Sequence, residues 1–237
     1  MINVDRVYQR VLTLANKEQR GYITPQEFNL LANQAQMSIF EQYFYDLNQF
    51  RRTPGNDTVH ADMVDILEEK IGIFEATASL PLVANPNGVA GNLNALPGFY
   101  RLSSARSGNT IMESVSRKDF RMFPNSPLAT PTATRPIYMV DTINSVIQIA
   151  GDNSLTTADI DYIQSPNLVN WTYVVVNEKA LLNPDPLAGY YDFELHPSDE
   201  TELVIKILGL AGFVLKDAEL YQIATTENNK DIQQQKQ

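Results

Sequence analysis

The stretch TPQEFNLLANQAQMSIFEQYFYDLNQF, residues 24–50, decides the fold class of the first third of the chain. It opens with a helix start: Thr24 can accept a hydrogen bond from the N3 amide, Pro25 suits the first helical position, and Glu27 can reach back to the Thr24 amide. Apolar residues then recur at helical spacing: Phe28, Leu31, Ala32, Ala35, Ile39, Tyr43, Leu47 and Phe50. We therefore predict one helix from Pro25 to about Phe50, roughly 39 Å long. Its wide apolar stripe should pack on several neighbours.

Helices are also predicted on both sides of this stretch. Residues 3–17 and 60–75 each carry apolar side chains at helical spacing. Between the second and the third helix, Pro54-Gly55 marks a turn. Three helices are therefore expected before residue 76.

The last part of the chain also begins with a helix start. Ser198 is expected to cap a helix, and the acids that follow, Asp199 and Glu200, are interpreted as solvent-exposed complements of the helix dipole. Gly212 is the expected end of this helix. Asp217 is expected to cap a further helix, which a polar tail follows.

Between these helical parts, residues 76 to about 195 have the pattern of β structure. Segments 136–142 and 145–151 flank a polar stretch and predict a hairpin. The segment NLVNWTYVVVNE, residues 167–178, is the strongest predicted strand, because β-branched and aromatic residues fill it. Proline, asparagine and glycine clusters separate the strands.

This order predicts an α+β fold, in which a helical bundle formed by the N-terminal and C-terminal helices carries an inserted β-rich subdomain. The N-terminal helices of the bundle are expected in residues 1–75, and the inserted subdomain in 76–197. Residues 198–224 are expected to complete the bundle, and residues 225–237 to form a polar docking tail.

Composition excludes several classes of function. The chain has no cysteine, which rules out disulfides and thiolate metal sites, and its two histidines are too few for a multi-histidine site within one chain. The net charge of −10 argues against a protein that coats DNA. No apolar run approaches the length of a membrane helix, so no membrane partner is expected.

No residue pattern specifies a reaction. His60 and His196 each lie near a predicted helix start, and no GxSxG motif accompanies them. The segment GDNSLTTADID, residues 151–161, lacks the Gly and Glu of a calcium loop and is interpreted as an Asx-rich turn. The segment NPNGVAGN, residues 85–92, lacks the spacing of a phosphate loop and is interpreted as a flexible loop. We therefore expect no enzymatic activity, no cofactor and no bound metal.

One basic concentration stands out, interleaved with the aromatic residues Tyr100, Phe120 and Phe123. It consists of Arg101, Arg106, Arg117, Lys118, Arg121 and Arg135. Three interpretations remain open: a nucleic-acid patch, exposed strand edges protected by charge, and a contact between subunits.

Two segments carry a resemblance to a known group. GYITPQEFNLLANQAQMSIFEQYFYDLNQF, residues 21–50, resembles the N-terminal helical region of structural proteins from tailed bacteriophages of the crAss-like type. FELHPSDETELVIKILGLAGFVLKDAELYQIATTEN, residues 193–228, resembles their C-terminal helical pair. The strand-rich sequence between them is similar to the β insertion of the same proteins. The group is that of head-to-tail connectors, also called adaptor, ring or tail-tubular proteins.

The resemblance implies a structural role in the virion, in the neck between the capsid portal and the tail. In this group, typically twelve copies form a ring below the portal protein and above the tail or a second ring protein. Double-stranded DNA passes through the ring without sequence-specific binding, which an acidic wall would permit. The implied portal-docking residues are Thr225, Thr226, Glu227, Asn228, Asn229, Lys230, Asp231 and Ile232.

An alternative function is a tail accessory protein that binds a glycan or the host surface through the β-rich subdomain. In that case Tyr100, Trp171 and Tyr173 would line a groove. The last two lie two positions apart and would share one face of a strand.

Overall fold

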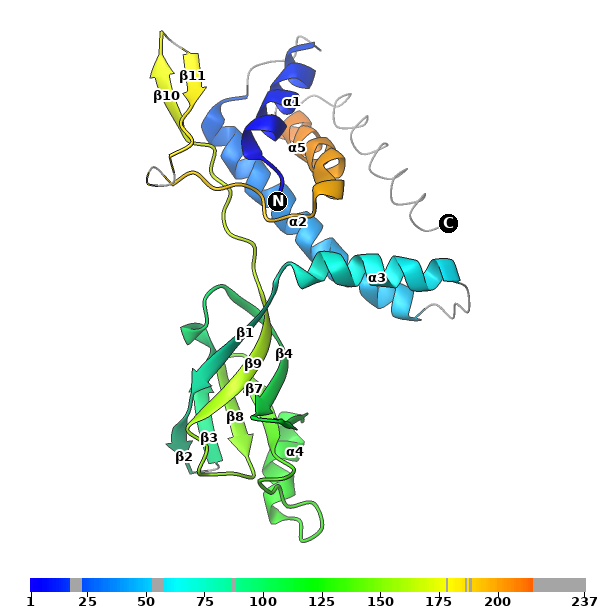
Figure 1. Cartoon of the computed structure of the whole chain (residues 1–237), viewed down its shortest axis with the longest axis vertical. Helices are drawn as coiled ribbons and strands as arrows, with labels where there is room; N and C mark the ends of the chain where they lie inside the picture. Colours follow the sequence, from blue (N-terminus) through cyan, green and yellow to red (C-terminus); the bar gives the residue numbers. More distant parts are fainter. Residues whose placement is uncertain are drawn as a thin grey trace. The chain divides into compact units, whose positions relative to one another are not determined.

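The computed structural model describes residues 1–17, 23–52, 58–86, 88–177, 179–185, 187 and 189–214. The architecture is α+β, as the sequence predicts, and the chain divides into two compact units (Figure 1). The helical unit holds Met1–Ile73 and the chain from Pro166 onward, and the β unit holds Phe74–Ser165. The turn expected at 54–55, the helix expected from 217 and the docking residues expected at 225–232 lie outside the described residues.

The helical unit is built on α2 (Pro25–Arg52). Its predicted start is confirmed, because the Thr24 amide donates to Glu27 Oε2 at 2.9 Å and the Glu27 amide donates to Thr24 Oγ1 at 3.3 Å. Its predicted apolar stripe is buried along much of its length, at Phe28, Ala32, Ala35, Ile39 and Tyr43, and the neighbouring Phe40 is buried as well. The other described helices of this unit are α1 (Val4–Lys17), α3 (Thr58–Gly72) and α5 (Glu200–Val214), which follows the 3-10 turn η4 (Pro197–Asp199).

The C-terminal helix α5 packs with the N-terminal helices. It contacts both α1 and α2, and α2 also contacts α3. The expected helix end at Gly212 is wrong, because α5 continues to Val214. Burial of Leu203, Ile207 and Ala211 outweighs the roughly 1 kcal/mol that a glycine costs inside a helix.

The β unit contains two sheets. The four-stranded sheet has the order β1-β9-β4-β5, and the five-stranded sheet the order β2-β3-β8-β7-β6. All pairings are antiparallel except that of β6 with β7. The strands of the first sheet are β1 (Glu75–Pro81), β4 (Phe99–Ser107), β5 (Thr110–Ile111) and β9 (Thr157–Gln164). Those of the second are β2 (Val83–Asn85), β3 (Gly88–Asn92), β6 (Glu113–Ser114), β7 (Ile137–Asp141) and β8 (Val146–Ala150).

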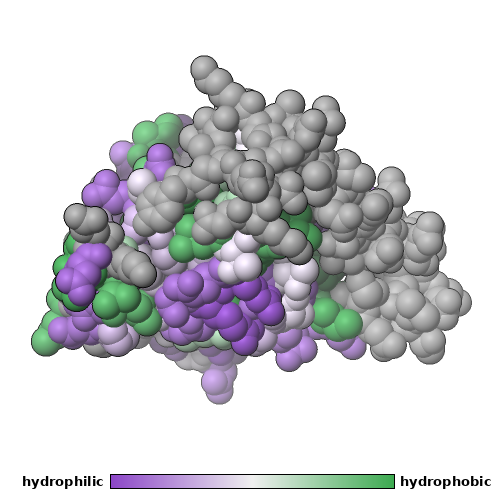
Figure 2. Space-filling view, turned by 90° about the horizontal axis from the view of Figure 1, so that it is seen from above, coloured by the Kyte–Doolittle hydropathy of each residue, from purple (hydrophilic) through white to green (hydrophobic). Residues whose placement is uncertain are grey.

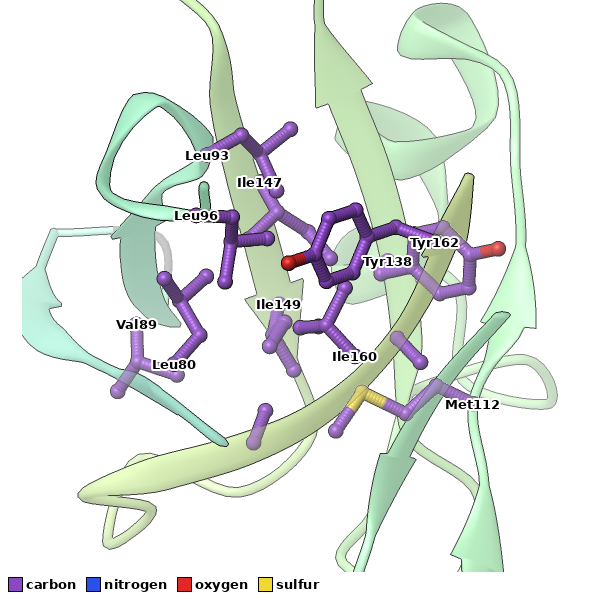
Figure 3. Close-up of a cluster of buried hydrophobic side chains, with 12 residues drawn as sticks. Leu80, Val89, Leu93, Leu96, Met112, Tyr138, Ile147, Ile149, Ile160 and Tyr162 are labelled. Carbon is purple, nitrogen blue, oxygen red and sulfur yellow. The ribbon is translucent and has the colours of Figure 1, made fainter. Parts of the chain in front are cut away.

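The core of the β unit lies between these two sheets. Side chains from both meet in one buried cluster, which includes Leu80, Val89, Ile149, Ile160 and Tyr162 (Figure 3). The short helix α4 (Arg117–Met122) packs on β7, where a second buried cluster forms around Phe120. Both faces of β7 are therefore covered. The remaining helical turns of the unit are η1 (Leu93–Ala95) and η2 (Phe123–Asn125).

Three local predictions for the β unit have different outcomes. The hairpin of β7 and β8 is confirmed. The prediction of a flexible loop at 85–92 is wrong, because residues 88–92 form the strand β3. At the start of this strand only glycine fits, since a Cβ atom on Gly88 would lie 2.0 Å from the Ile149 carbonyl oxygen. The Asx-rich turn expected at 151–161 is right for Asp152, which accepts from the Ser154 amide, but from Thr157 onward the chain is the central strand β9.

The two ends of the β unit are adjacent. The Gln164 amide donates to the Phe74 carbonyl oxygen at 2.8 Å, and Glu75 opposes Ile163 in the first rung of the β1–β9 pairing. The chain therefore enters and leaves this unit through neighbouring strands.

The chain between 166 and 197 belongs to the helical unit, whereas its composition predicts a place in the β-rich subdomain. The strand predicted at 167–178 is largely wrong. Only β10 (Tyr173–Val176) is regular, and it pairs with β11 (Lys179–Leu182) in a two-stranded ribbon (Figure 1). The residues before β10 run along α2 instead.

Candidate functional site

A ladder of amide side chains on α2 holds this extended segment. Asn33 accepts from the Val169 amide at 2.7 Å and donates to the Val169 carbonyl at 2.9 Å, as a neighbouring strand would. Asn29 makes the same pair of hydrogen bonds with Trp171, at 2.9 and 3.2 Å. One turn further on, Gln36 donates to the Asn167 carbonyl at 2.8 Å. The helix thus satisfies backbone groups that would otherwise pair in a sheet.

Trp171 is anchored by this ladder and completely enclosed. Its ring centroid lies 4.2 Å from that of Tyr8, and its Nε1 donates a hydrogen bond to Asp5 Oδ1 at 2.9 Å. It also stacks on Tyr173, with the ring centroids 5.8 Å apart. Only 1% of Trp171 is exposed, and Tyr100 belongs to the other unit. The glycan groove expected from these three aromatic residues is therefore not formed by Trp171.

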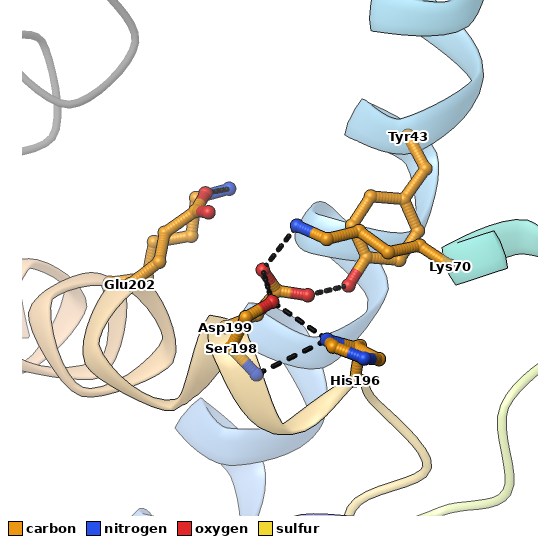
Figure 4. Close-up of polar contacts among 7 residues, drawn as sticks. Tyr43, Lys70, His196, Ser198, Asp199 and Glu202 are labelled. Carbon is orange, nitrogen blue, oxygen red and sulfur yellow. Dashed lines mark hydrogen bonds and ion pairs between the residues drawn. The ribbon is translucent and has the colours of Figure 1, made fainter. Parts of the chain in front are cut away.

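A buried polar network joins α2, α3 and the start of α5 (Figure 4). Lys70 Nζ lies 2.6 Å from Asp199 Oδ1, the Tyr43 hydroxyl donates to Asp199 Oδ2, and the Ser198 hydroxyl donates to Asp199 Oδ1 at 3.1 Å. Burial, and next the negative charge of Asp199, raise the pKa of Tyr43 well above its usual value. His196 caps the η4 turn by accepting from the Ser198 amide, so its predicted place beside a helix start is confirmed.

The neighbouring acid Glu200 ties α1 to α5. Arg6 donates from Nε to Glu200 Oε1 at 2.8 Å, and Arg10 Nη1 lies 2.6 Å from the same oxygen. The interpretation of Asp199 and Glu200 as solvent-exposed is wrong, because both are buried and ion-paired. Buried carboxylates need such partners, and here the partners come from helices distant in sequence. The cluster provides structural cross-links between these helices.

The six basic residues all lie in the β unit, and half of them are paired. Arg106 contacts Asp161 at 3.0 Å, Arg117 contacts Asp141 at 3.1 Å, and Arg135 contacts Glu113 at 3.2 Å. Among the described residues, no ion pair is found for the other three: Arg101, Lys118 and Arg121. The hydrogen bond from Ser104, followed by other polar contacts, holds the pKa of Asp161 below its usual range.

These pairs weaken the case for a nucleic-acid patch. The β unit carries seven acidic side chains beside its six basic ones, so its charges nearly cancel. The residues that line a cavity of about 570 Å³ in this unit include Arg121, Phe120 and three prolines, Pro86, Pro124 and Pro131. A single cation among prolines does not form the basic stripe that tracks a phosphate backbone.

A larger groove of about 750 Å³ runs between α1 and α5 in the helical unit. Its apolar lining comes from Leu14 on α1 and from Val204, Ile205 and Leu208 on α5. The sequence gives only an indirect sign of this surface. Helix α5 is apolar around most of its circumference, and helices of that kind are covered on all sides in folded proteins.

The β10–β11 ribbon is the second exposed apolar surface of the helical unit. Val174, Val175 and Val176 follow one another and are each about half exposed or more, as is Leu181 on the partner strand. In the view of Figure 2, hydrophobic side chains reach the surface at several separate places among hydrophilic ones. Exposed apolar patches of this kind mark interaction sites.

In the described part of the chain, no helix combines the length and apolar character that a membrane crossing requires. Nor does that part contain a group of three or more His, Asp or Glu side chains placed to hold a metal ion. No protein-family model and no curated protein matches the sequence.

Proposed function

We propose that the chain is a non-enzymatic structural subunit that assembles into a ring in the neck of a tailed bacteriophage, between the portal and the tail. The observation that carries the proposal is the pair of exposed apolar surfaces on one unit, the β10–β11 ribbon and the α1–α5 groove. Two different surfaces on the same subunit suit a head-to-tail interface, which closes into a ring when its rotation allows.

The distribution of charge supports the proposed passage of double-stranded DNA. Almost the whole net charge of −10 resides outside Phe74–Ser165, in the residues of the helical unit. A wall with this charge repels the phosphate backbone and does not retain the passing duplex. In this proposal the portal lies above the ring, and the tail or a second ring protein lies below it.

Mass photometry of the purified chain tests the proposal, alone and mixed with the portal protein of the same phage. We expect a discrete species of many copies, with twelve as the copy number that the resemblance implies. A variant that ends at residue 224 should still form the ring but should fail to bind the portal. A monomer at every concentration, also with portal present, would overturn the ring proposal.

A further inference from the structure

The groove between α1 and α5 has an apolar end and a basic end. The two helices lie side by side (Figure 1), and both supply its lining. Ile205 and Leu208 line the groove toward the C-terminal turns of α5. Arg6 and Arg10 line it at the other end, because both pair with Glu200, the first residue of α5. The lining therefore changes along α5 from apolar to cationic.

The two arginines at the basic end keep hydrogen-bond donors in reserve. Arg6 and Arg10 share the carboxylate of Glu200, and their side chains are 62% and 52% exposed. Each guanidinium has about five N–H donors, more than one shared carboxylate can satisfy. Asp5, the one acid of the groove lining, accepts from Trp171 Nε1. The basic end therefore suits a further carboxylate.

The chain that follows α5 carries matching chemistry in a matching order. It continues for 23 residues after α5, and its sequence predicts a helix that Asp217 caps. Leu220 and Ala224 share one face of that helix, and at the same spacing Glu227 and Asp231 continue the face. A segment that returns along α5 from its end therefore brings apolar residues to the apolar end of the groove and acids to the basic end.

The lengths agree as well. Along α5, Leu208 and Glu200 lie roughly 9 and 21 Å from the end of the helix, at about 1.5 Å per residue. Along a helix that starts at Asp217, Ala224 and Asp231 lie roughly 10 and 21 Å from the start. The apolar and the acidic positions of the segment thus fall level with the two ends of the groove.

The groove and the segment have net charges of opposite sign. The lining holds Arg6, Arg10 and Asp5, which give a net charge of +1. Residues 217–231 hold four acids and one base, Lys230, which give a net charge of −3. Around a helix, Lys230 lies on the flank of the acidic face. Charge therefore favours this segment in the groove.

Tethering favours the same segment over a separate molecule. Only residues 215 and 216 lie between α5 and Asp217, and about two to five residues suffice to join antiparallel helices. A short tether gives an effective concentration in roughly the millimolar range, which exceeds that of a free partner in dilute solution. The largely apolar surface of α5 also calls for a cover on this side.

We propose that residues 217–231 of the same chain fill the α1–α5 groove of the free subunit. The apolar half of the segment covers the apolar end, and its acids reach the arginines. The consequence for assembly rests on the proposed ring, which uses the same groove. The segment covers one ring surface and holds most of the portal-docking residues until a neighbouring copy displaces it.

Cysteine cross-linking tests the contact, because the chain has no native cysteine. The double variant Leu208→Cys/Ala224→Cys is oxidised mildly in dilute solution. The matched control is Leu208→Cys/Gln222→Cys, since Gln222 lies about 160° from Ala224 around a helix and faces away from the groove.

We expect at least about tenfold more disulfide within one chain for the first variant than for the control, because a disulfide needs Cβ atoms about 4 Å apart. Peptide mass spectrometry identifies the bond, and non-reducing electrophoresis shows whether it joins one chain or two. Equal yields, or disulfides only between two chains, would overturn the proposed contact.

Thiol labelling gives a second measurement that needs no disulfide. Leu14 lines the groove and is 43% exposed among the described residues, so Leu14→Cys reports whether the groove is covered. Adding Leu220→Asp should speed its reaction with a maleimide about tenfold, since a buried carboxylate disfavours docking. Adding Gln222→Asp, on the opposite face, should leave the rate unchanged. Equal rates in the two backgrounds would also overturn the contact.

Mass photometry of the same two full-length variants separates this inference from the ring. Leu220→Asp should form the proposed ring at about tenfold lower protein concentration than the unmodified chain, and Gln222→Asp at the same concentration. A ring with no selective disulfide refutes the groove contact and leaves the ring. A selective disulfide with no ring from any variant refutes the proposed function and leaves the groove contact.

Discussion

The buried ion pair of Lys70 and Asp199 allows a quantitative prediction about stability. Their side chains are 14% and 5% exposed, and Lys70→Met leaves the Asp199 carboxylate buried with hydrogen bonds from Tyr43 and Ser198 alone. Removing one partner of a buried pair typically costs about 3–5 kcal/mol. Because those two hydrogen bonds remain, we expect the lower end, about 3 kcal/mol of unfolding free energy. For a chain of this size that corresponds to a fall in Tm of roughly 6–12 °C.

Urea unfolding followed by fluorescence measures this loss, since Trp171 is the single tryptophan and reports on the helical unit. The matched control is Arg51→Met: Arg51 lies 2.6 Å from Glu68, as Lys70 does from Asp199, but these side chains are 59% and 50% exposed. Exposed pairs contribute about 0–1 kcal/mol. Equal effects of Lys70→Met and Arg51→Met would refute the reasoning. So would a double variant, Lys70→Met with Asp199→Asn, that is no more stable than Lys70→Met alone.

Three further predictions concern hydrogen bonds and pH. Asn33→Ala removes both side-chain hydrogen bonds to the Val169 backbone and should lower the unfolding free energy by about 2–3 kcal/mol, measured by the same fluorescence assay. The pKa of Asp161 is lowered, chiefly by Ser104, so its stabilisation is present above pH 4 and is lost on acidification; Asp161→Asn should flatten the acid limb of Tm against pH. The pKa of Tyr43 is raised, so its contribution is complete below about pH 10 and falls above it. Tyr43→Phe should reduce that alkaline decline in urea titrations.

Local signals predicted the helices well. The start of α2 is encoded by Thr24 and Glu27, which contact each other, so no distant residue is needed to recognise it. The end of α5 is different, because the cost of Gly212 is local whereas the burial that offsets it comes from α1 and α2.

Strand prediction was less successful for a related reason. Residues 167–176 have high β propensity, yet the partner of Val169 is the Asn33 amide on a helix, and propensity carries no information about partners. The strand β9 carried a readable signal, since Ala158, Ile160 and Tyr162 alternate with polar residues and are buried.

The candidate surfaces depend on distant contacts as well. Asp199 and Glu200 look like ordinary acids at a helix start, and only their pairing with Lys70 on α3 and Arg6 on α1 explains their burial. Sequence alone also does not tell which arginine of β4 forms an ion pair. Arg106 pairs across the sheet with Asp161, whereas no ion pair is found for Arg101 on the same strand among the described residues. The valine run of β10 was visible in the sequence, but its exposure was not.

The adjacent ends of the β unit make it an exchangeable cassette. Because the Gln164 amide is bonded to the Phe74 carbonyl, the chain departs and returns at points only about 5 Å apart. A linker of two or three residues could bridge the site of excision. The β unit is therefore a point at which another module with closely spaced ends could be inserted into the chain of the helical unit.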